Sequence, residues 1–136
     1  MGSELTLAGR KLVQVALTCR DLDRARNFYR DTLGLTLLFE AGNMLFFDVA
    51  GQRLMVGLSE TPDRPIGGSY LYFDAPDIFA LAEALEARGV KFTGNVETLQ
   101  RTQTHELKLQ FFTDPDGNAL ALMGMVPTPG VAANPA

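Results

Sequence analysis

The sequence predicts an α+β protein made of two tandem βαβββ modules that form a curved mixed sheet around a cleft. Three observations predict this fold. Runs of apolar residues switch repeatedly between the two-residue period of strands and the longer period of helices. The same order of segments occurs twice, on either side of a segment rich in Pro and Gly at residues 61–68. The boundaries of the two expected helices also repeat, because Asp77 and Gly89 follow Asp21 and Gly34 at nearly equal distances.

The first module is expected at about residues 10–60, after a leader of residues 1–9. Its apolar pattern predicts one strand, one helix and three further strands, in that order, at residues 12–19, 22–33, 35–40, 44–49 and 53–58. Asp21 is a suitable N-cap for the helix, and Gly34 is a suitable residue to end it. The last two strands should form a hairpin through residues 50–51.

The second module is expected at about residues 69–125, after a linker of residues 61–68. It repeats the order of the first, with elements at residues 70–74, 78–88, 91–94, 106–112 and 119–123. Asp77 should cap the helix, Gly89 should end it, and residues 116–117 should turn the chain between the last two strands. One helix can cover only one face of each sheet, so two modules facing one another would enclose a cleft. The alternative is an unrelated ferredoxin-like α+β domain.

Length and composition favour one compact domain. The chain has 136 residues, of which 46% are hydrophobic, and this is enough to close a core without covalent links. Cys19 is the only cysteine, which excludes an intramolecular disulfide and favours a packed role for its side chain. The formal net charge is −4 and the 12 Lys and Arg are scattered, so nucleic acid is not an expected partner. Residues 126–136, rich in Pro and Ala, are expected to form a flexible tail.

Several motifs resemble those of a known superfamily. They are QVALTCRD from Gln14, FYRDTLGL from Phe28, YLYFDAPD from Tyr70 and FTDPDGN from Phe112. In this order they resemble the vicinal oxygen chelate superfamily, which includes glyoxalases, bleomycin resistance proteins and ring-cleaving dioxygenases. The resemblance spans about residues 11–125 and implies the paired βαβββ fold.

In metal-using relatives, the resemblance implies four metal ligands, one on each of four inward-facing strands. The first position falls on Gln14, which is a weak oxygen donor. The second falls around residues 55–57, where no carboxylate is present, and Glu60 lies beyond the strand. The usual His of the second module falls on Tyr70, and the usual Glu of the last strand falls on Ala121. Amide, phenol and methyl groups do not make a first-row metal site, so no metal is expected.

The alternation of strand residues predicts which side chains face the cleft. These are the expected ligand-binding residues Gln14, Tyr70, Tyr72, Ala121 and Met123. The two tyrosines could stack on a planar ligand or pack in the core with bonded hydroxyls. Gln14 could orient a ligand carbonyl or satisfy a neighbouring backbone group.

These residues suggest two functions of different classes. The first is a metal-free glyoxalase- or bleomycin-resistance-like protein that binds a planar or apolar small molecule in its cleft. The alternative is a metal-independent, or atypical metal-dependent, lyase, isomerase or dioxygenase-like enzyme in which His105 or Glu106 moves a proton. Adjacent strand residues point to opposite faces, so at most one of these two enters the cleft. A third interpretation is an interaction domain whose cleft is filled by its own side chains.

The remaining expectations concern cofactors, location and assembly. The sequence contains no nucleotide-binding glycine motif, so no cofactor is expected. No apolar run reaches the roughly 18 residues of a membrane helix, and the N-terminus lacks a signal-peptide pattern. We therefore expect a cytoplasmic protein without membrane contact. The resemblance implies a homodimer, because relatives pair modules across subunits and short sheets otherwise leave exposed edges.

Overall fold

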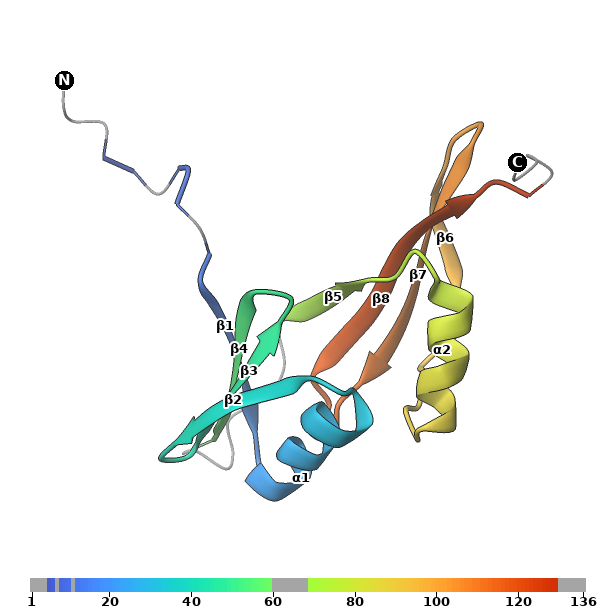
Figure 1. The fold of residues 1–136 in the computed structure, drawn as a ribbon. Helices are drawn as coiled ribbons and strands as arrows, with labels where there is room; N and C mark the ends of the chain where they lie inside the picture. Colours follow the sequence, from blue (N-terminus) through green and yellow to red (C-terminus); the bar gives the residue numbers. More distant parts are fainter. Residues whose placement is uncertain (1–4, 7, 11, 60–68, 130–136) are drawn as a thin grey trace.

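The computed structural model describes residues 5–6, 8–10, 12–59 and 69–129. In these residues the predicted fold class is confirmed: two βαβββ modules each build a four-stranded mixed sheet (Figure 1). The expected linker and most of the expected leader and tail lie outside the described residues. None of the described helices is long and apolar enough to span a membrane.

The first module forms a sheet with the strand order β1-β4-β3-β2. Its elements are β1 (Gln14–Cys19), α1 (Leu22–Arg26), the π-helical continuation η1 (Asn27–Thr32), β2 (Thr36–Ala41), β3 (Met44–Val49) and β4 (Gln52–Leu58). β1 runs parallel to β4, and the other pairs are antiparallel. The predicted hairpin between β3 and β4 is confirmed, because Ala50 and Gly51 both adopt positive φ angles that suit a tight turn.

The predicted boundaries of the first helix are also confirmed. A side-chain oxygen of Asp21 accepts a hydrogen bond from the Arg24 backbone N–H at 3.0 Å, which satisfies a donor of the first turn. Gly34 ends the helical segment with a φ of 80°, a conformation that glycine adopts without a steric cost.

The second module forms a sheet with the strand order β5-β8-β7-β6. Its elements are β5 (Tyr70–Asp74), α2 (Ile78–Ala87), β6 (Glu97–Arg101), β7 (His105–Thr113) and β8 (Ala119–Pro127). β5 runs parallel to β8, as β1 does to β4 in the first module. β8 continues to Pro127, because Val126 and Pro127 pair with the start of β7, so the sheet extends into the segment expected to be a tail.

Two predictions for the second module are wrong in detail. The strand expected at residues 91–94 is absent from the described structure, where Phe92 forms only an isolated bridge with Phe112. The sixth strand is instead Glu97–Arg101, and it was missed because its residues are exposed on both faces and show no apolar alternation. Asp77 does occupy the N-cap position of α2, but its side chain makes no capping hydrogen bond.

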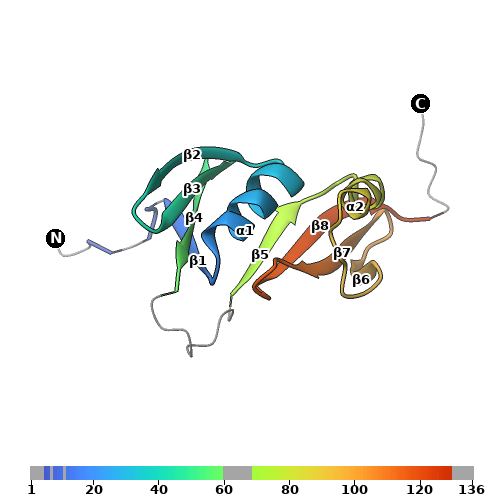
Figure 2. The same cartoon turned by 90° about the horizontal axis from the view of Figure 1, so that it is seen from below.

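The helices divide each sheet into a covered face and an open face. α1 lies on the side of the first sheet that faces the second module (Figure 1 and Figure 2). It packs against β3 and β4, and α2 packs against β8. The covered faces of both sheets contribute to one apolar core, which includes Leu17, Phe47, Phe112 and Leu122. The open face of the first sheet is therefore turned away from the second module.

Candidate functional site

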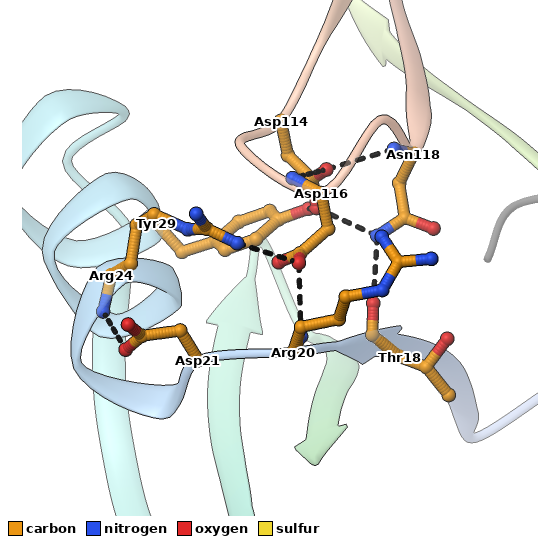
Figure 3. A network of polar contacts seen from close by, with 8 residues as sticks. All are labelled: Thr18, Arg20, Asp21, Arg24, Tyr29, Asp114, Asp116 and Asn118. Carbon is orange, nitrogen blue, oxygen red and sulfur yellow. Dashed lines mark hydrogen bonds and ion pairs between the residues drawn. The ribbon is translucent and has the colours of Figure 1, made fainter. Parts of the chain in front are cut away.

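The residues of two sequence motifs meet in a buried polar network where the modules join (Figure 3). One carboxylate oxygen of Asp114 accepts from the backbone N–H groups of Asp116 and Asn118 at 2.9 and 2.8 Å. The other oxygen accepts from the Tyr29 hydroxyl at 2.8 Å and from the Asn118 side-chain amide at 2.7 Å. Burial, followed by the nearby Asp114 charge, raises the pKa of Tyr29, so this hydroxyl stays protonated as a donor.

The same turn also holds β1 and the start of α1. Asp116 accepts from the Arg20 backbone N–H and from the Arg24 guanidinium, both at 2.9 Å. The Asn118 side chain donates to the backbone carbonyl of Thr18 at 2.8 Å. Tyr29 of the FYRDTLGL motif and the polar residues of the DPDGN turn thus join the two modules.

Cys19 lies close to this network and does not have the properties of a nucleophile. Its side chain is fully buried. Burial, with a smaller contribution from Asp116, raises the pKa of the Cys19 thiol to about 11. The expected packed role of this residue agrees with its position.

The open face of the first sheet contains a hollow of about 340 Å³. It is lined by Ala16, Leu17, Thr18, Asn43, Met44, Met55, Gly57 and Leu58. Gln14 lies on the same face of β1, beyond the residues that line the hollow, and is paired in register with Arg53 of β4. The structure thus places Gln14 on the first module, apart from the tyrosines of the second.

The open face of the second sheet contains a hollow of about 270 Å³ beside an aromatic cluster. The hollow is lined by Tyr72, Phe73, Asp74, Leu107, Met123, Gly124 and Met125. Tyr70, Tyr72 and Phe111 form the cluster, with ring centroids 6.0 to 6.5 Å apart. Tyr70 and Tyr72 are 59% and 50% exposed, which excludes the core-packing interpretation for both. Ala121 is fully buried and pairs in register with Tyr72 and Phe111, so it supports the cluster from below.

A third cavity, of about 450 Å³, lies where the two modules meet along β5. It is lined by Val15, Val49, Ala50, Gln52, Leu54, Tyr70, Leu71, Tyr72, Phe73 and Asp74. Tyr70 faces this junction cavity and does not line the hollow of the second sheet, whereas Tyr72 lines both. Of the expected ligand-binding residues, the structure therefore brings together Tyr70, Tyr72, Ala121 and Met123.

The side chains at the family's metal positions do not fit a divalent metal. The positions are occupied by Gln14, by the thioether and glycine of residues 55–57, by Tyr70 and by Ala121. Within the described residues, no group of three or more His, Cys, Asp or Glu lies close enough together to hold a metal ion. Glu60 lies outside the described residues. This donor set lacks the three or four convergent N, O or S ligands that such a metal requires.

The His105–Glu106 pair is divided between the two faces of β7. His105 is exposed, and its Nδ1 lies 3.0 Å from the Thr104 hydroxyl. Glu106 is fully buried on the opposite face, with its oxygens 2.6 Å from the Lys108 ammonium and 2.5 Å from the Arg101 guanidinium. Contact with Lys108, followed by attraction to Arg101, lowers the pKa of Glu106 despite its burial. Neither His105 nor Glu106 lines any of the three cavities described above.

Comparisons with known proteins agree with this architecture. The family model described as the glyoxalase/bleomycin resistance protein/dioxygenase superfamily matches residues 11–122. A solved member of that superfamily from Sphaerobacter thermophilus is 27% identical, with a TM-score of 0.70 over 84% of this chain and 96% of that chain. A glyoxalase/bleomycin resistance protein/dioxygenase from Alicyclobacillus acidocaldarius is 23% identical, with a TM-score of 0.68 over 85% and 91% of the chains. A lactoylglutathione lyase from Agrobacterium tumefaciens is 22% identical, with a TM-score of 0.67 over 85% and 93%.

Proposed function

The chain belongs to the glyoxalase/bleomycin resistance protein/dioxygenase superfamily, and we propose that it binds a planar or largely apolar small molecule without a metal ion. The observation that carries this proposal is the half-exposed aromatic cluster of Tyr70, Tyr72 and Phe111 beside the hollow of the second sheet. Stacking of a planar ligand on exposed aromatic rings lowers the free energy of binding, in addition to the favourable effect of burying apolar surface. Met123 adds a polarisable thioether to the same hollow.

Two observations favour binding over proton-transfer catalysis. The polar side chains of the DPDGN turn are committed to the junction of the modules. The buried Glu106 carboxylate is already neutralised by two cations on the face opposite Tyr72. A general base must reach the substrate proton within hydrogen-bond distance, and Glu106 is not placed to do so. Neither the DPDGN turn nor Glu106 is thus placed for proton transfer, and the enzyme alternative depends on the exposed His105 alone.

We also propose that the protein forms a homodimer in the cytoplasm. Gln14 and the tyrosines lie on the open faces of different modules. A second copy that laid its second sheet over the first sheet would bring Gln14 toward Tyr70 and Tyr72. The exposed apolar residues on these faces support this arrangement, because clustered exposed apolar surface favours association.

Binding can be tested by calorimetry with a panel of planar aromatic compounds. Tyr72→Ala should weaken the tightest binder by about 1 to 3 kcal/mol, or roughly tenfold or more, because one stacking surface is lost. Tyr70→Ala should have a similar effect. Phe79→Ala is a matched control, because Phe79 of α2 is also 59% exposed but lies outside the three cavities. Binding that ignores both tyrosines and is lost in His105→Ala would contradict the proposal and favour the enzyme.

A further inference from the structure

Arg53 is held over two aromatic rings on the open face of the first sheet. Phe39 of β2 and Phe46 of β3 stack with their centroids 4.3 Å apart and an interplanar angle of 15°. The Arg53 guanidinium carbon lies 5.8 Å from the Phe39 centroid and 6.0 Å from the Phe46 centroid. Cation–π contacts at these distances restrain a side chain that is otherwise flexible.

Within the described part of the chain, no carboxylate accepts a hydrogen bond from Arg53. Among the residues that the structure describes, Arg24, Arg26, Arg30 and Arg101 each form an ion pair with an acidic side chain, and Arg53 forms none. A guanidinium has five donors in a planar fork that matches a carboxylate. Arg53 is therefore oriented by its aromatic support and still able to bind an anion.

The acidic neighbour of Arg53 uses one carboxylate oxygen in the hairpin turn and forms no ion pair with Arg53. Asp48 pairs with Arg53 in register across β3 and β4. An oxygen of Asp48 accepts from the Gly51 backbone N–H at 3.1 Å in the hairpin turn. On the other side, β1 places the amide of Gln14 opposite Arg53. An incoming anion would thus meet a cation and an amide donor side by side.

The hollow of the first sheet begins next to this cation. Met55, which lines it, lies two residues after Arg53 on the same face of β4, a distance of about 7 Å along a strand. Gly57 keeps the floor of the hollow open. A Cβ atom on Gly57 would lie 3.2 Å from the Met55 sulfur and 3.6 Å from the Met44 Cγ. An apolar surface and an available cation thus lie within the span of one small molecule.

We propose that the open face of the first sheet binds a planar or apolar ligand that carries a carboxylate, with Arg53 as the residue that recognises the anionic group. This inference rests on the proposed function and names its ligand class. The net charge of −4 repels anions at long range, so an anionic ligand must be recognised by a local group such as Arg53. Met44 and Met55 contact the apolar part of the ligand, and Gln14 donates to the carboxylate.

Calorimetry with 2-naphthoate and its uncharged counterpart 2-naphthamide tests this inference. The parent should bind 2-naphthoate at least tenfold more tightly than 2-naphthamide. Arg53→Gln should abolish this preference and leave the affinity for 2-naphthamide unchanged. Arg30→Gln is the control, because it removes the same charge from an exposed arginine that pairs with Asp31 on η1. Gly57→Val should weaken binding of both compounds by filling the hollow.

The outcomes separate this inference from the function on which it rests. Equal affinity of the parent for the two compounds would overturn the carboxylate assignment and leave the binding function standing. An equal loss in Arg30→Gln and Arg53→Gln would also overturn it, because net charge alone would then explain the preference. If neither compound nor any planar compound of the panel bound, both the inference and the proposed function would fail.

Discussion

Asp114 accepts four hydrogen bonds with two oxygens, and each donor belongs to a group that is itself buried. Two of these donors are backbone N–H groups of its own turn. A third comes from Tyr29 in the other module, so one carboxylate both shapes the β7–β8 turn and fastens it to η1. At the scale of single residues, the junction of the modules depends on this side chain more than on any exposed ion pair.

Asp114→Ala should lower the free energy of unfolding by about 3 kcal/mol or more, because four buried donors lose their acceptor at once. Urea unfolding followed by circular dichroism would measure the change. Asp77→Ala is the control, since the Asp77 side chain makes no capping bond and should shift stability by less than about 0.5 kcal/mol. Equal effects of the two substitutions would show that the network does not stabilise the junction.

Glu106 should make stability depend on acidic pH. Its pKa is lowered in the folded protein, so its contribution is present above the ordinary glutamate pKa of about 4.3 and is lost as pH falls through the lowered value. Glu106→Gln should therefore be less stable than the parent at pH 7, and this difference should shrink below about pH 4. Thermal unfolding between neutral and acidic pH would test this, with exposed Glu83→Gln on α2 as the control. A difference that stays constant with pH would contradict the ion-pair role.

At the scale of elements, the sequence predicted those strands and helices in which one face is buried. The helix over residues 22–33 and the strand at residues 44–49 agree with the structure because apolar residues recur with the period of the element. β6 was missed because its sequence, ETLQR, has a single apolar residue, whereas the similarly exposed edge strand β2 is rich in apolar residues. The strand expected at residues 91–94 includes Phe92, which instead contacts the core from a loop.

The close approach between β8 and the segment after β5 could not be read from the sequence. A Cβ atom on Gly124 would lie 1.7 Å from the carbonyl oxygen of Ala75 and 2.4 Å from its carbonyl carbon. Only glycine fits there, because the contacting atoms belong to the backbone and cannot rotate away. The glycine in ALALMGMV is thus required by packing between two elements that are distant in sequence.

Gly124→Ala should destabilise the protein by roughly 3 kcal/mol or more and strongly reduce its soluble yield, because a backbone segment must move to admit one methyl group. Gly94→Ala is the matched control, since an added Cβ there has no heavy atom within 4 Å and its φ is not positive. Thermal unfolding of the two variants would measure the difference. Equal stability of the two variants would show that the backbone at Ala75 can move away from residue 124 at little cost.

At the scale of the whole molecule, the internal duplication and the motifs predicted the superfamily and both sheets. The two-residue alternation of the strands predicted the sheet faces on which the side chains of Gln14 and Tyr72 lie. Sequence periodicity could not show that first-sheet strands and β5 line one cavity, because that depends on how the modules dock. For the same reason it could not place Arg53 over Phe39 and Phe46, since β2 and β4 are brought together only by the sheet.

The separation of the two open faces leads to a prediction about assembly. If a second copy covers the first sheet, light scattering at micromolar concentration should give twice the chain mass of 14.8 kDa. Met44→Glu should then yield a monomer, because it would bury a carboxylate in the apolar hollow of this face. The temperature of unfolding should rise with protein concentration in the parent and not in this variant.

Phe79→Glu provides the matched control for this assembly, because it adds the same charge at an exposed aromatic residue on α2, away from both open faces. It should remain dimeric. A monomeric parent, or a Met44→Glu protein that stays dimeric, would mean that the open faces of two copies do not pack together. Gln14 and Tyr72 would then act at two independent sites. In that case Tyr72→Ala should leave the affinity of the Arg53 site for 2-naphthoate unchanged, whereas in a face-to-face dimer it should weaken binding of both compounds.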